Sequence, residues 1–231
     1  LELPENPKAF ALLAHCFTCG KDLKGAARIA RKLTENAIAV LRFDFTGLGN
    51  SEGDFSNTNF SSNISDLLCA VDYLRRQYEA PSLLIGHSLG GSAILSIAGE
   101  VPEAKAVVTI GSPGELTHVK RLFKDDVENI NQHGAYPVEL AGRVFTLKKQ
   151  MLDNIQEHKI AHKVFAMNKP LLIFHATEDD TVLIEQAEKI FKAAKHPKSF
   201  ISLGKADHLL THAQDAEYVA DIIISWSECY L

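Results

Sequence analysis

Short apolar runs alternate along the chain with longer stretches in which apolar residues recur every three or four positions. The short runs predict buried strands, and the spacing of the longer stretches is typical of amphipathic helices. The predicted strands are Ala9–Ala14, Ile38–Phe43, Leu83–Gly86, Ala106–Ile110, Leu171–His175 and Ser199–Ser202, and the predicted helices are Lys21–Glu35, Ile64–Tyr78, Leu89–Gly99, Leu183–Ala194 and Ala213–Cys229. This alternation indicates an α/β fold, with a mostly parallel central sheet and helices on both faces.

The alternation breaks off between residues 115 and 167. This segment is rich in charged residues and in Asn, Gln and His, and it has no apolar run that predicts a core strand. A connection of this length between two strands is typical of a lid or binding element. We therefore predict a helical cap here, inserted into a single domain that comprises residues 1–231. Its apolar residues are candidates either to line a substrate pocket or to join the cap to the core: Phe123, Tyr136, Val138, Phe145, Leu147 and Met151.

Composition and charge narrow the class of protein. The 231 residues, of which 46% are hydrophobic and 23% charged, are typical of a single globular domain. The net charge of −5 comes without a basic stripe, so we expect no nucleic acid as a partner. No apolar run approaches the roughly 18 residues that span a bilayer, so we expect no membrane span.

The cysteine content and the first residues bear on location. Four cysteines are too few for a scaffold held together by disulfides, so we expect a reducing, cytoplasmic location. The chain begins at Leu1 and shows no apolar segment of the signal-peptide type behind a basic start. We expect these residues to be part of a longer natural protein.

A glycine-rich turn joins a predicted strand to a predicted helix around Ser88. It reads Gly86-His87-Ser88-Leu89-Gly90 and matches the nucleophile elbow, Gly-x-Ser-x-Gly. The residues two before and two after the nucleophile must be small because the turn is tight, and Gly86 and Gly90 meet that need. The helix that follows directs backbone N–H groups and the positive end of its dipole toward the serine. A plain glycine-rich turn is the alternative; the flanking strand and helix favour the elbow, with Ser88 as nucleophile.

A serine hydroxyl is a weak nucleophile that needs a base to take its proton and an acid to orient the base. Behind a nucleophile elbow, the acid follows a late strand and the histidine comes last in the chain. Asp179 follows the predicted strand 171–175 and is the candidate acid, with Asp180 and Glu178 as neighbouring alternatives. An acid at this place can instead serve only as the cap of the next helix.

The candidate base is His208, which lies between the last predicted strand and the last predicted helix. His212 lies one helical turn further along and is its alternative. His87 is adjacent to the nucleophile in sequence, but the elbow directs its side chain away. We expect most of the other histidines to be surface or packing residues.

Acyl transfer also needs hydrogen-bond donors for the oxyanion of the tetrahedral intermediate. The backbone N–H of Leu89, directly after the nucleophile, is one candidate, and the N–H of Phe17, in the loop after the first strand, is the other. The same loop contains Cys16 and Cys19, a spacing that also occurs in redox and zinc sites. No second Cys/His pair has metal-site spacing. We therefore expect two unpaired, partly buried thiols and no bound metal.

The glycine-rich segment 42–53 has some likeness to a phosphate-binding loop. It lacks the Lys-[Ser/Thr] ending of a P-loop and the glycine spacing of a dinucleotide site. We expect a structural turn instead, in which Asp44 accepts hydrogen bonds from backbone amides.

Taken together, these segments resemble the α/β-hydrolase superfamily across almost the whole chain. The loop His15-Cys16-Phe17, the run 44–51, the elbow, Asp179 and His208 follow one another in the order found in that superfamily. The resemblance implies an α/β-hydrolase fold, a Ser-Asp-His triad and hydrolysis of esters or related acyl bonds. Many relatives have a glycine where this chain has Cys16. The resemblance therefore supports the triad more closely than it supports Phe17 as an oxyanion donor.

Two shorter runs narrow the resemblance further. Ala14–Cys19 and Val138–Arg143 look like a bacterial subgroup of hydrolases that is often fused to an OsmC-like domain. No such second domain is present in these residues. Because members of the subgroup mostly have undefined substrates, the resemblance specifies the fold more closely than the reaction.

We predict a serine hydrolase, most specifically a carboxylesterase that cleaves small or medium acyl esters through an acyl-enzyme intermediate. Ser88 attacks the carbonyl, His208 transfers the proton and Asp179 orients His208, while the Phe17 and Leu89 amides hold the oxyanion. The serine is activated by its neighbours, so no cofactor is expected, and the expected partner is a small-molecule acyl ester. The same residues suit a thioesterase, an amidase or an acyltransferase, and the fold also suits a non-catalytic ligand-binding module.

Overall fold

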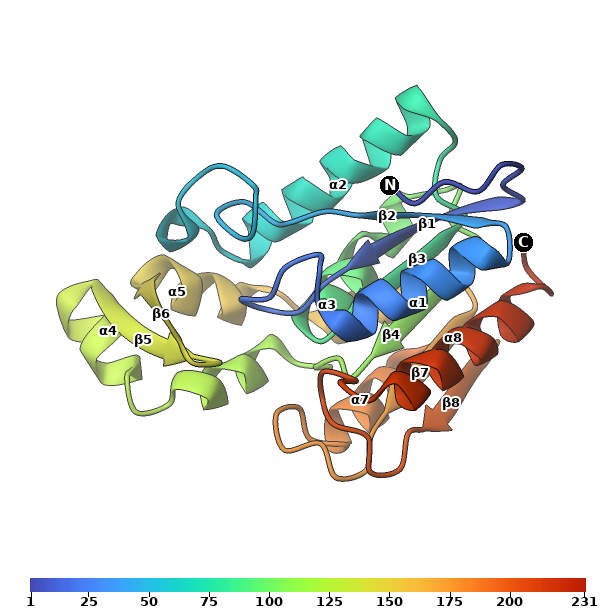
Figure 1. Ribbon diagram of the computed structural model, residues 1–231. Coiled ribbons are helices and arrows are strands. Elements are labelled where there is room, and N and C mark those ends of the chain that lie inside the picture. The colour runs from blue at the N-terminus through green and yellow to red at the C-terminus, as the bar shows by residue number, and fades with distance from the viewer.

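The computed structural model describes residues 1–231, and at its centre lies a six-stranded sheet (Figure 1). The strands are β1 (Ala9–Ala14), β2 (Ile38–Arg42), β3 (Leu83–His87), β4 (Ala106–Ile110), β7 (Leu171–His175) and β8 (Lys198–Ser202). Neighbouring strands are all parallel, in the order β2-β1-β3-β4-β7-β8. The chain therefore runs outward from β1 in one direction to β2 and in the other to β8. Every strand predicted from the sequence is present.

Helices cover both faces of this sheet. On one face, α1 (Lys24–Glu35) and α8 (Ala213–Ser227) lie side by side (Figure 1). The helices that pack on the other face are α2 (Phe60–Gln77), α3 (Leu89–Ile97), α6 (Ile160–Met167) and α7 (Glu185–Ala193), and two short 3-10 helices are η1 (Phe55–Asn57) and η2 (Ala98–Glu100). The predicted α/β fold with two helical layers is confirmed. No helix of the chain is both long enough and apolar enough to cross a bilayer.

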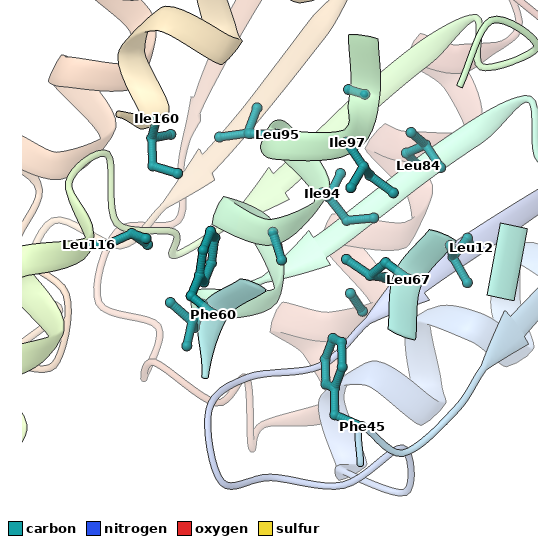
Figure 2. Packing of buried hydrophobic residues seen from close by; sticks show 14 of the residues in the cluster. Leu12, Phe45, Phe60, Leu67, Leu84, Ile94, Leu95, Ile97, Leu116 and Ile160 are labelled. Atoms are coloured by element: carbon teal, nitrogen blue, oxygen red, sulfur yellow. The ribbon is translucent and has the colours of Figure 1, made fainter. Parts of the chain in front are cut away.

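Five of the six strands, β1, β2, β3, β4 and β7, are mostly apolar and bury both of their faces. The edge strand β8 is more polar and partly exposed. In β3, the side chain of Leu84 joins the core under α2 and α3, whereas Leu83 and Ile85 join the core under α1 and α8. Figure 2 shows the first of these cores, in which Leu67 of α2 and Ile94 of α3 pack close to the sheet. Close packing of this kind on both faces fixes the strands, and with them the loops that leave their carboxyl ends.

The segment between β4 and β7 contains a hairpin that the sequence analysis did not predict. Its helices are η3 (Leu116–Phe123), α4 (Val127–His133) and α5 (Lys149–Glu157), followed by α6, and its strands are β5 (Ala135–Leu140) and β6 (Arg143–Lys148). The two strands pair antiparallel, and the turn between them has positive φ at both Ala141 (50°) and Gly142 (74°). Two such residues make the type I′ geometry that matches the twist of a hairpin. Figure 1 shows the hairpin beyond the ends of the central strands, beside α4 and α5.

Candidate active site

Ser88 occupies a strained turn between β3 and α3. Its φ of 54° and ψ of −128° lie outside the regions that residues with a side chain ordinarily adopt. The Ser88 N–H donates to the carbonyl of Ile110 in the neighbouring strand at 2.8 Å, which holds the turn in place. A Cβ at Gly86 would collide with the backbone of Gly90 and Gly91, and one at Gly90 would collide with the carbonyl oxygen of His15. Glycine is therefore a steric requirement at both positions.

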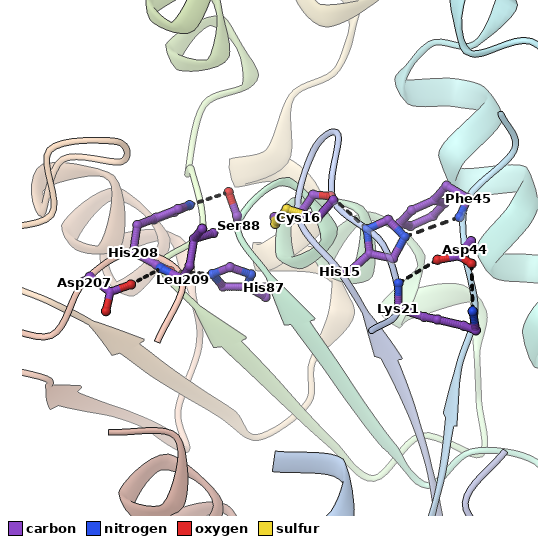
Figure 3. Close-up of a disulfide and its surroundings, with 11 residues drawn as sticks. His15, Cys16, Lys21, Asp44, Phe45, His87, Ser88, Asp207, His208 and Leu209 are labelled. Carbon is purple, nitrogen blue, oxygen red and sulfur yellow. Dashed lines mark hydrogen bonds and ion pairs between the residues drawn. A yellow bond between two sulfur atoms is a disulfide. The ribbon is translucent and has the colours of Figure 1, made fainter. Parts of the chain in front are cut away.

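The structure brings Ser88, His208 and Asp179 together from three separate loops. Ser88 Oγ lies 2.9 Å from His208 Nε2, and His208 Nδ1 lies 2.7 Å from Asp179 Oδ2. When Nδ1–H donates to the carboxylate, Nε2 is left to accept the serine proton. Figure 3 shows the imidazole of His208 directed at the hydroxyl. The side chains are mostly withdrawn from solvent, with Ser88 and Asp179 as residues 7% and 6% exposed.

The carboxylate of Asp179 is held ionised by its hydrogen-bond donors. Its Oδ1 accepts from the backbone N–H groups of Thr181 (3.0 Å) and Val182 (2.9 Å), while Oδ2 faces His208. Burial alone would raise the pKa of this carboxyl, but the hydrogen bonds and the nearby imidazole hold the pKa below its usual range. Asp179 therefore stays negative at neutral pH and orients the imidazole.

The alternatives from the sequence lie elsewhere. Glu178 and Asp180 are exposed, and neither bonds to His208; Asp180 accepts from the Thr181 hydroxyl instead. His212 is exposed at the start of α8 and makes no contact of this kind with Ser88. Of the acids and histidines considered from the sequence, only Asp179 and His208 are connected to Ser88 by hydrogen bonds.

Two backbone N–H groups near Ser88 are free to donate hydrogen bonds to a negatively charged oxygen. Leu89 is the first residue of α3, and Phe17 lies in the loop after β1. Neither N–H donates to an acceptor within the protein. The two residues also line one small, mostly apolar pocket, together with Gly90 and Ala93 of α3. They are therefore available as a pair of oxyanion donors.

The loop that carries Phe17 is braced by a buried polar network (Figure 3). His15 Nδ1–H donates to the Cys16 carbonyl at 2.8 Å, and burial lowers the pKa of His15, so that its ring stays neutral. The carboxylate of Asp44 accepts from the N–H groups of Lys21 (2.6 Å) and Asn50 (3.0 Å). The structural role expected for Asp44 is confirmed.

His87 is a residue whose role the sequence analysis missed. Its ring points away from Ser88, as expected, but its Nε2–H donates to the backbone carbonyl of His208 at 2.7 Å. The residue is buried, and burial, together with the neighbouring His208, lowers the pKa of the ring to about 3. A neutral His87 thus fixes the backbone of the residue that contacts Ser88. No pattern in the sequence distinguishes this histidine from a packing residue.

Replacing His87 with phenylalanine should change how stability depends on pH. In wild type, unfolding frees this ring to take up a proton below its ordinary pKa of 6.5, so stability falls as the pH falls from 6.5 toward 3. Between pH 6.5 and about pH 5 this one group should cost about 2 kcal/mol. When the free energy of unfolding is measured in urea at several pH values, it should fall on acidification by about 2 kcal/mol less in His87→Phe than in wild type. Parallel pH profiles for the two proteins would contradict the buried neutral ring.

A cavity of about 270 Å³ opens beside the three side chains. Ser88 and His208 lie on one wall, the loop 16–19 forms a second, and the hairpin tip 139–141 with Leu122 forms a third. The cap residues proposed as pocket lining are absent from these walls. They instead pack into the core, either buried or, for Tyr136, partly buried: Phe123, Tyr136, Val138, Phe145, Leu147 and Met151.

The structure also corrects the expectation of unpaired thiols at Cys16 and Cys19, which form a disulfide with a Cα–Cα distance of 5.4 Å. The free cysteines are Cys69 and Cys229, both exposed. No group of three or more His, Cys, Asp or Glu side chains is arranged to hold a metal ion.

Comparison with known proteins identifies the family to which this chain belongs. Residues 5–125 match the family model Hydrolase_4, described as serine aminopeptidase, S33. The esterase domain of a Rhodothermus marinus protein is 44% identical, with a TM-score of 0.78 over 99% of this chain and 90% of that one. Est1E from Butyrivibrio proteoclasticus, solved with ferulic acid bound, is 22% identical and has a TM-score of 0.84 over 99% and 92% of the two chains.

More distant similarity connects the chain to thioesterases. The mitochondrial palmitoyl-protein thioesterase ABHD10 of Bos taurus is 26% identical over 151 residues, which cover 62% of this chain. The matched part is 48% of that protein, and the chain spans about half the length of this thioesterase and of its human counterpart.

Proposed function

Because the chain belongs to the α/β-hydrolase family described as serine aminopeptidase, S33, we propose that this serine hydrolase is a carboxylesterase acting on small or medium acyl esters. The observation that carries the proposal is the hydrogen-bonded series from Ser88 through His208 to Asp179 beside an open cavity. The cavity volume of about 270 Å³ lies just below the ~300–1,000 Å³ typical of small-molecule sites. That size suits a short acyl group.

The reaction follows from the positions of the groups. Ser88 Oγ gives its proton to His208 Nε2 as it attacks the ester carbonyl, and Asp179 stabilises the imidazolium that forms. The N–H groups of Phe17 and Leu89 stabilise the negative oxygen of the tetrahedral intermediate. His208 then protonates the leaving alcohol. A water molecule, activated by the same imidazole, releases the acid from the acyl-enzyme.

We propose the same single-domain arrangement for residues 1–231 that the sequence predicts, with the segment 115–167 as its cap. The hairpin tip at 139–141 supports this proposal, because it supplies a cavity wall from a segment that lies outside the central sheet. A cytoplasmic location remains part of the proposal.

A panel of p-nitrophenyl esters from acetate to palmitate tests the proposed activity. The expected result is the highest kcat/KM with short or medium chains and a steep fall toward palmitate, since the cavity is small. A fluorophosphonate probe should label the native enzyme, and peptide mapping should place the label on Ser88. No turnover and no label on the native protein would favour a non-catalytic module.

A thioesterase is the second candidate, favoured by the similarity to palmitoyl-protein thioesterases. Thioester analogues of the same acyl chains belong in the same panel, because the triad acts on the acyl group and does not by itself select the leaving group. Higher kcat/KM for thioesters than for the matching oxygen esters would favour this candidate.

A further inference from the structure

The Cys16–Cys19 disulfide lies on the wall of the cavity that contains Ser88 (Figure 3). Cys16 is buried, whereas Cys19 is partly exposed. All four residues of the loop 16–19 line the cavity. A small molecule that enters the cavity therefore reaches the disulfide as well as the serine.

The disulfide closes a turn that its own residues do not favour. The Cys19 N–H donates to the Cys16 carbonyl at 3.2 Å, and Thr18 has a φ of 60°. Positive φ at the third position of such a turn normally calls for glycine. It is a strained conformation for a β-branched residue such as threonine. The cross-link holds this strain, and a loop without the cross-link is free to relax.

Phe17 lies inside this ring, between the two cysteines. Its N–H is one of the two proposed oxyanion donors, and the direction of that N–H depends on the conformation of the turn. Removing one oxyanion donor typically lowers kcat by about 10²–10³-fold. A small change in the turn is therefore enough to alter the rate without changing Ser88, His208 or Asp179.

We propose that Cys16 and Cys19 form a thiol–disulfide exchange site for small dithiols, and that its redox state sets the activity of the enzyme. This inference rests on the proposed esterase function. The oxidised form has the Phe17 N–H in place and is active, whereas the reduced form relaxes at Thr18 and is slow. A reducing compartment, which the sequence predicts, supplies the thiols for this exchange.

The exchange proceeds in two steps. A thiolate of the dithiol attacks the sulfur of Cys19, forms a mixed disulfide with it and releases the Cys16 thiolate. The second thiol of the reductant then attacks its own sulfur in the mixed disulfide and releases the Cys19 thiolate. Two electrons pass to the protein, and the dithiol leaves as a cyclic disulfide. An added disulfide such as oxidised glutathione reverses both steps.

The test uses a Cys69→Ser/Cys229→Ser background, in which the loop holds the only cysteines. The protein is treated with dithiothreitol, freed of it by anaerobic desalting and assayed with p-nitrophenyl butyrate; alkylation and intact mass count the free thiols. We expect kcat to fall by about 10²-fold with little change in KM as two thiols appear. Oxidised glutathione should restore kcat.

Thr18→Gly in the same background isolates the strain. Glycine adopts positive φ without steric strain, so the reduced loop should be under no strain to leave this turn, and reduction should lower kcat much less than in the parent protein. Unchanged kcat with both thiols free would overturn the inference, as would a disulfide that native protein never exchanges. A fall in kcat that accompanies loss of the folded state on thermal unfolding would indicate only a structural cross-link. Absence of ester hydrolysis by the oxidised parent would instead refute the proposed function.

A second, independent observation concerns charge at the same cavity. Glu139 lies on the hairpin wall with an exposed carboxylate that has no ion-pair or hydrogen-bond partner. Apart from His208, it is the only ionisable side chain among the twelve residues that line the cavity. An unpaired carboxylate here attracts a positive charge on a bound acyl group and repels a negative one.

We also infer that Glu139 is a specificity-determining residue, which disfavours acyl groups that carry a carboxylate and favours those that carry a cation. This inference too rests on the proposed function. For two unit charges separated by roughly 8 Å in a partly aqueous medium, Coulomb's law gives a change in affinity of about three- to five-fold in either direction. The preference for a cationic over an anionic substrate should therefore be on the order of ten-fold.

Three p-nitrophenyl esters that share a four-carbon acyl chain test it: butyrate, 4-trimethylammoniobutyrate and hemisuccinate. In wild type, kcat/KM relative to butyrate should rise for the cationic ester and fall for the anionic one. Glu139→Gln should reduce the cation-to-anion ratio about ten-fold, and high salt should reduce the wild-type ratio. Asp125→Asn removes the same charge from an exposed cap residue outside the cavity and should keep the ratio.

Two results would overturn this role of Glu139: an unchanged ratio in Glu139→Gln, or the same reduction in Asp125→Asn. Failure of all three proteins to hydrolyse the neutral butyrate would instead count against the esterase proposal itself.

Discussion

Replacing Ser88 with alanine should lower kcat for short acyl esters by roughly 10⁴–10⁶-fold. The hydroxyl is the only group that lies in hydrogen-bond contact with His208 Nε2, so no other side chain stands ready to form the acyl-enzyme. KM should change little, because the cavity walls and the oxyanion donors remain. The residual rate would be hydrolysis by water, assisted by those donors. Stopped assays at high enzyme concentration, with fluorophosphonate labelling in parallel, measure both effects.

Ser96→Ala is the matched control for this variant. Ser96 lies on α3, the helix that follows Ser88, and is also buried, but its hydroxyl donates to the carbonyl of Ser92 and does not line the cavity. Its kcat should stay close to that of wild type. Substantial turnover by Ser88→Ala would mean that another nucleophile does the chemistry, and loss of activity in both variants would point to α3 packing instead.

The central sheet was predictable because short apolar runs that alternate with amphipathic helices are typical of a parallel sheet covered on both faces. The ends of helices were less predictable. The pattern of α2 suggests a start at Ile64, but the helix begins at Phe60, since Asn59 and Ser62 form a capping box that starts it one turn earlier. The β5–β6 hairpin was missed because Ala141-Gly142 lacks the Asn-Gly or Asp-Gly signal of its turn.

In the site, too, residues that belong to a local sequence motif were predictable, whereas contacts that depend on the folded structure were not. Ser88 could be proposed as the nucleophile because a nucleophile elbow imposes glycine at fixed distances, and Asp179 and His208 could be proposed as its partners because each follows a strand in a known order. The contact between His87 and the carbonyl of His208 could not be found, since it joins residues 121 positions apart by a backbone acceptor that leaves no trace in sequence. The place of Glu139 on the cavity wall likewise depends on where the hairpin packs.

Asp179→Asn should lower kcat by about 10³–10⁴-fold while the protein stays folded. Two backbone donors, the N–H groups of Thr181 and Val182, hold Oδ1. In the variant they should hold the amide oxygen in the same place, which turns the amide NH₂ toward His208 Nδ1. Nδ1 must then accept a hydrogen bond, so the proton moves to Nε2, and Nε2–H cannot take the proton of Ser88.

Asp180→Asn separates this effect from a general loss of negative charge. It makes the same chemical change one residue away, at an exposed carboxylate that bonds to the Thr181 hydroxyl and not to His208. Its kcat should remain near that of wild type. If the large loss fell on Asp180→Asn instead, or on both variants equally, the acid would have been assigned to the wrong residue of this loop. A loss confined to Asp179→Asn, at unchanged KM, would identify the imidazole tautomer as the property that Asp179 controls.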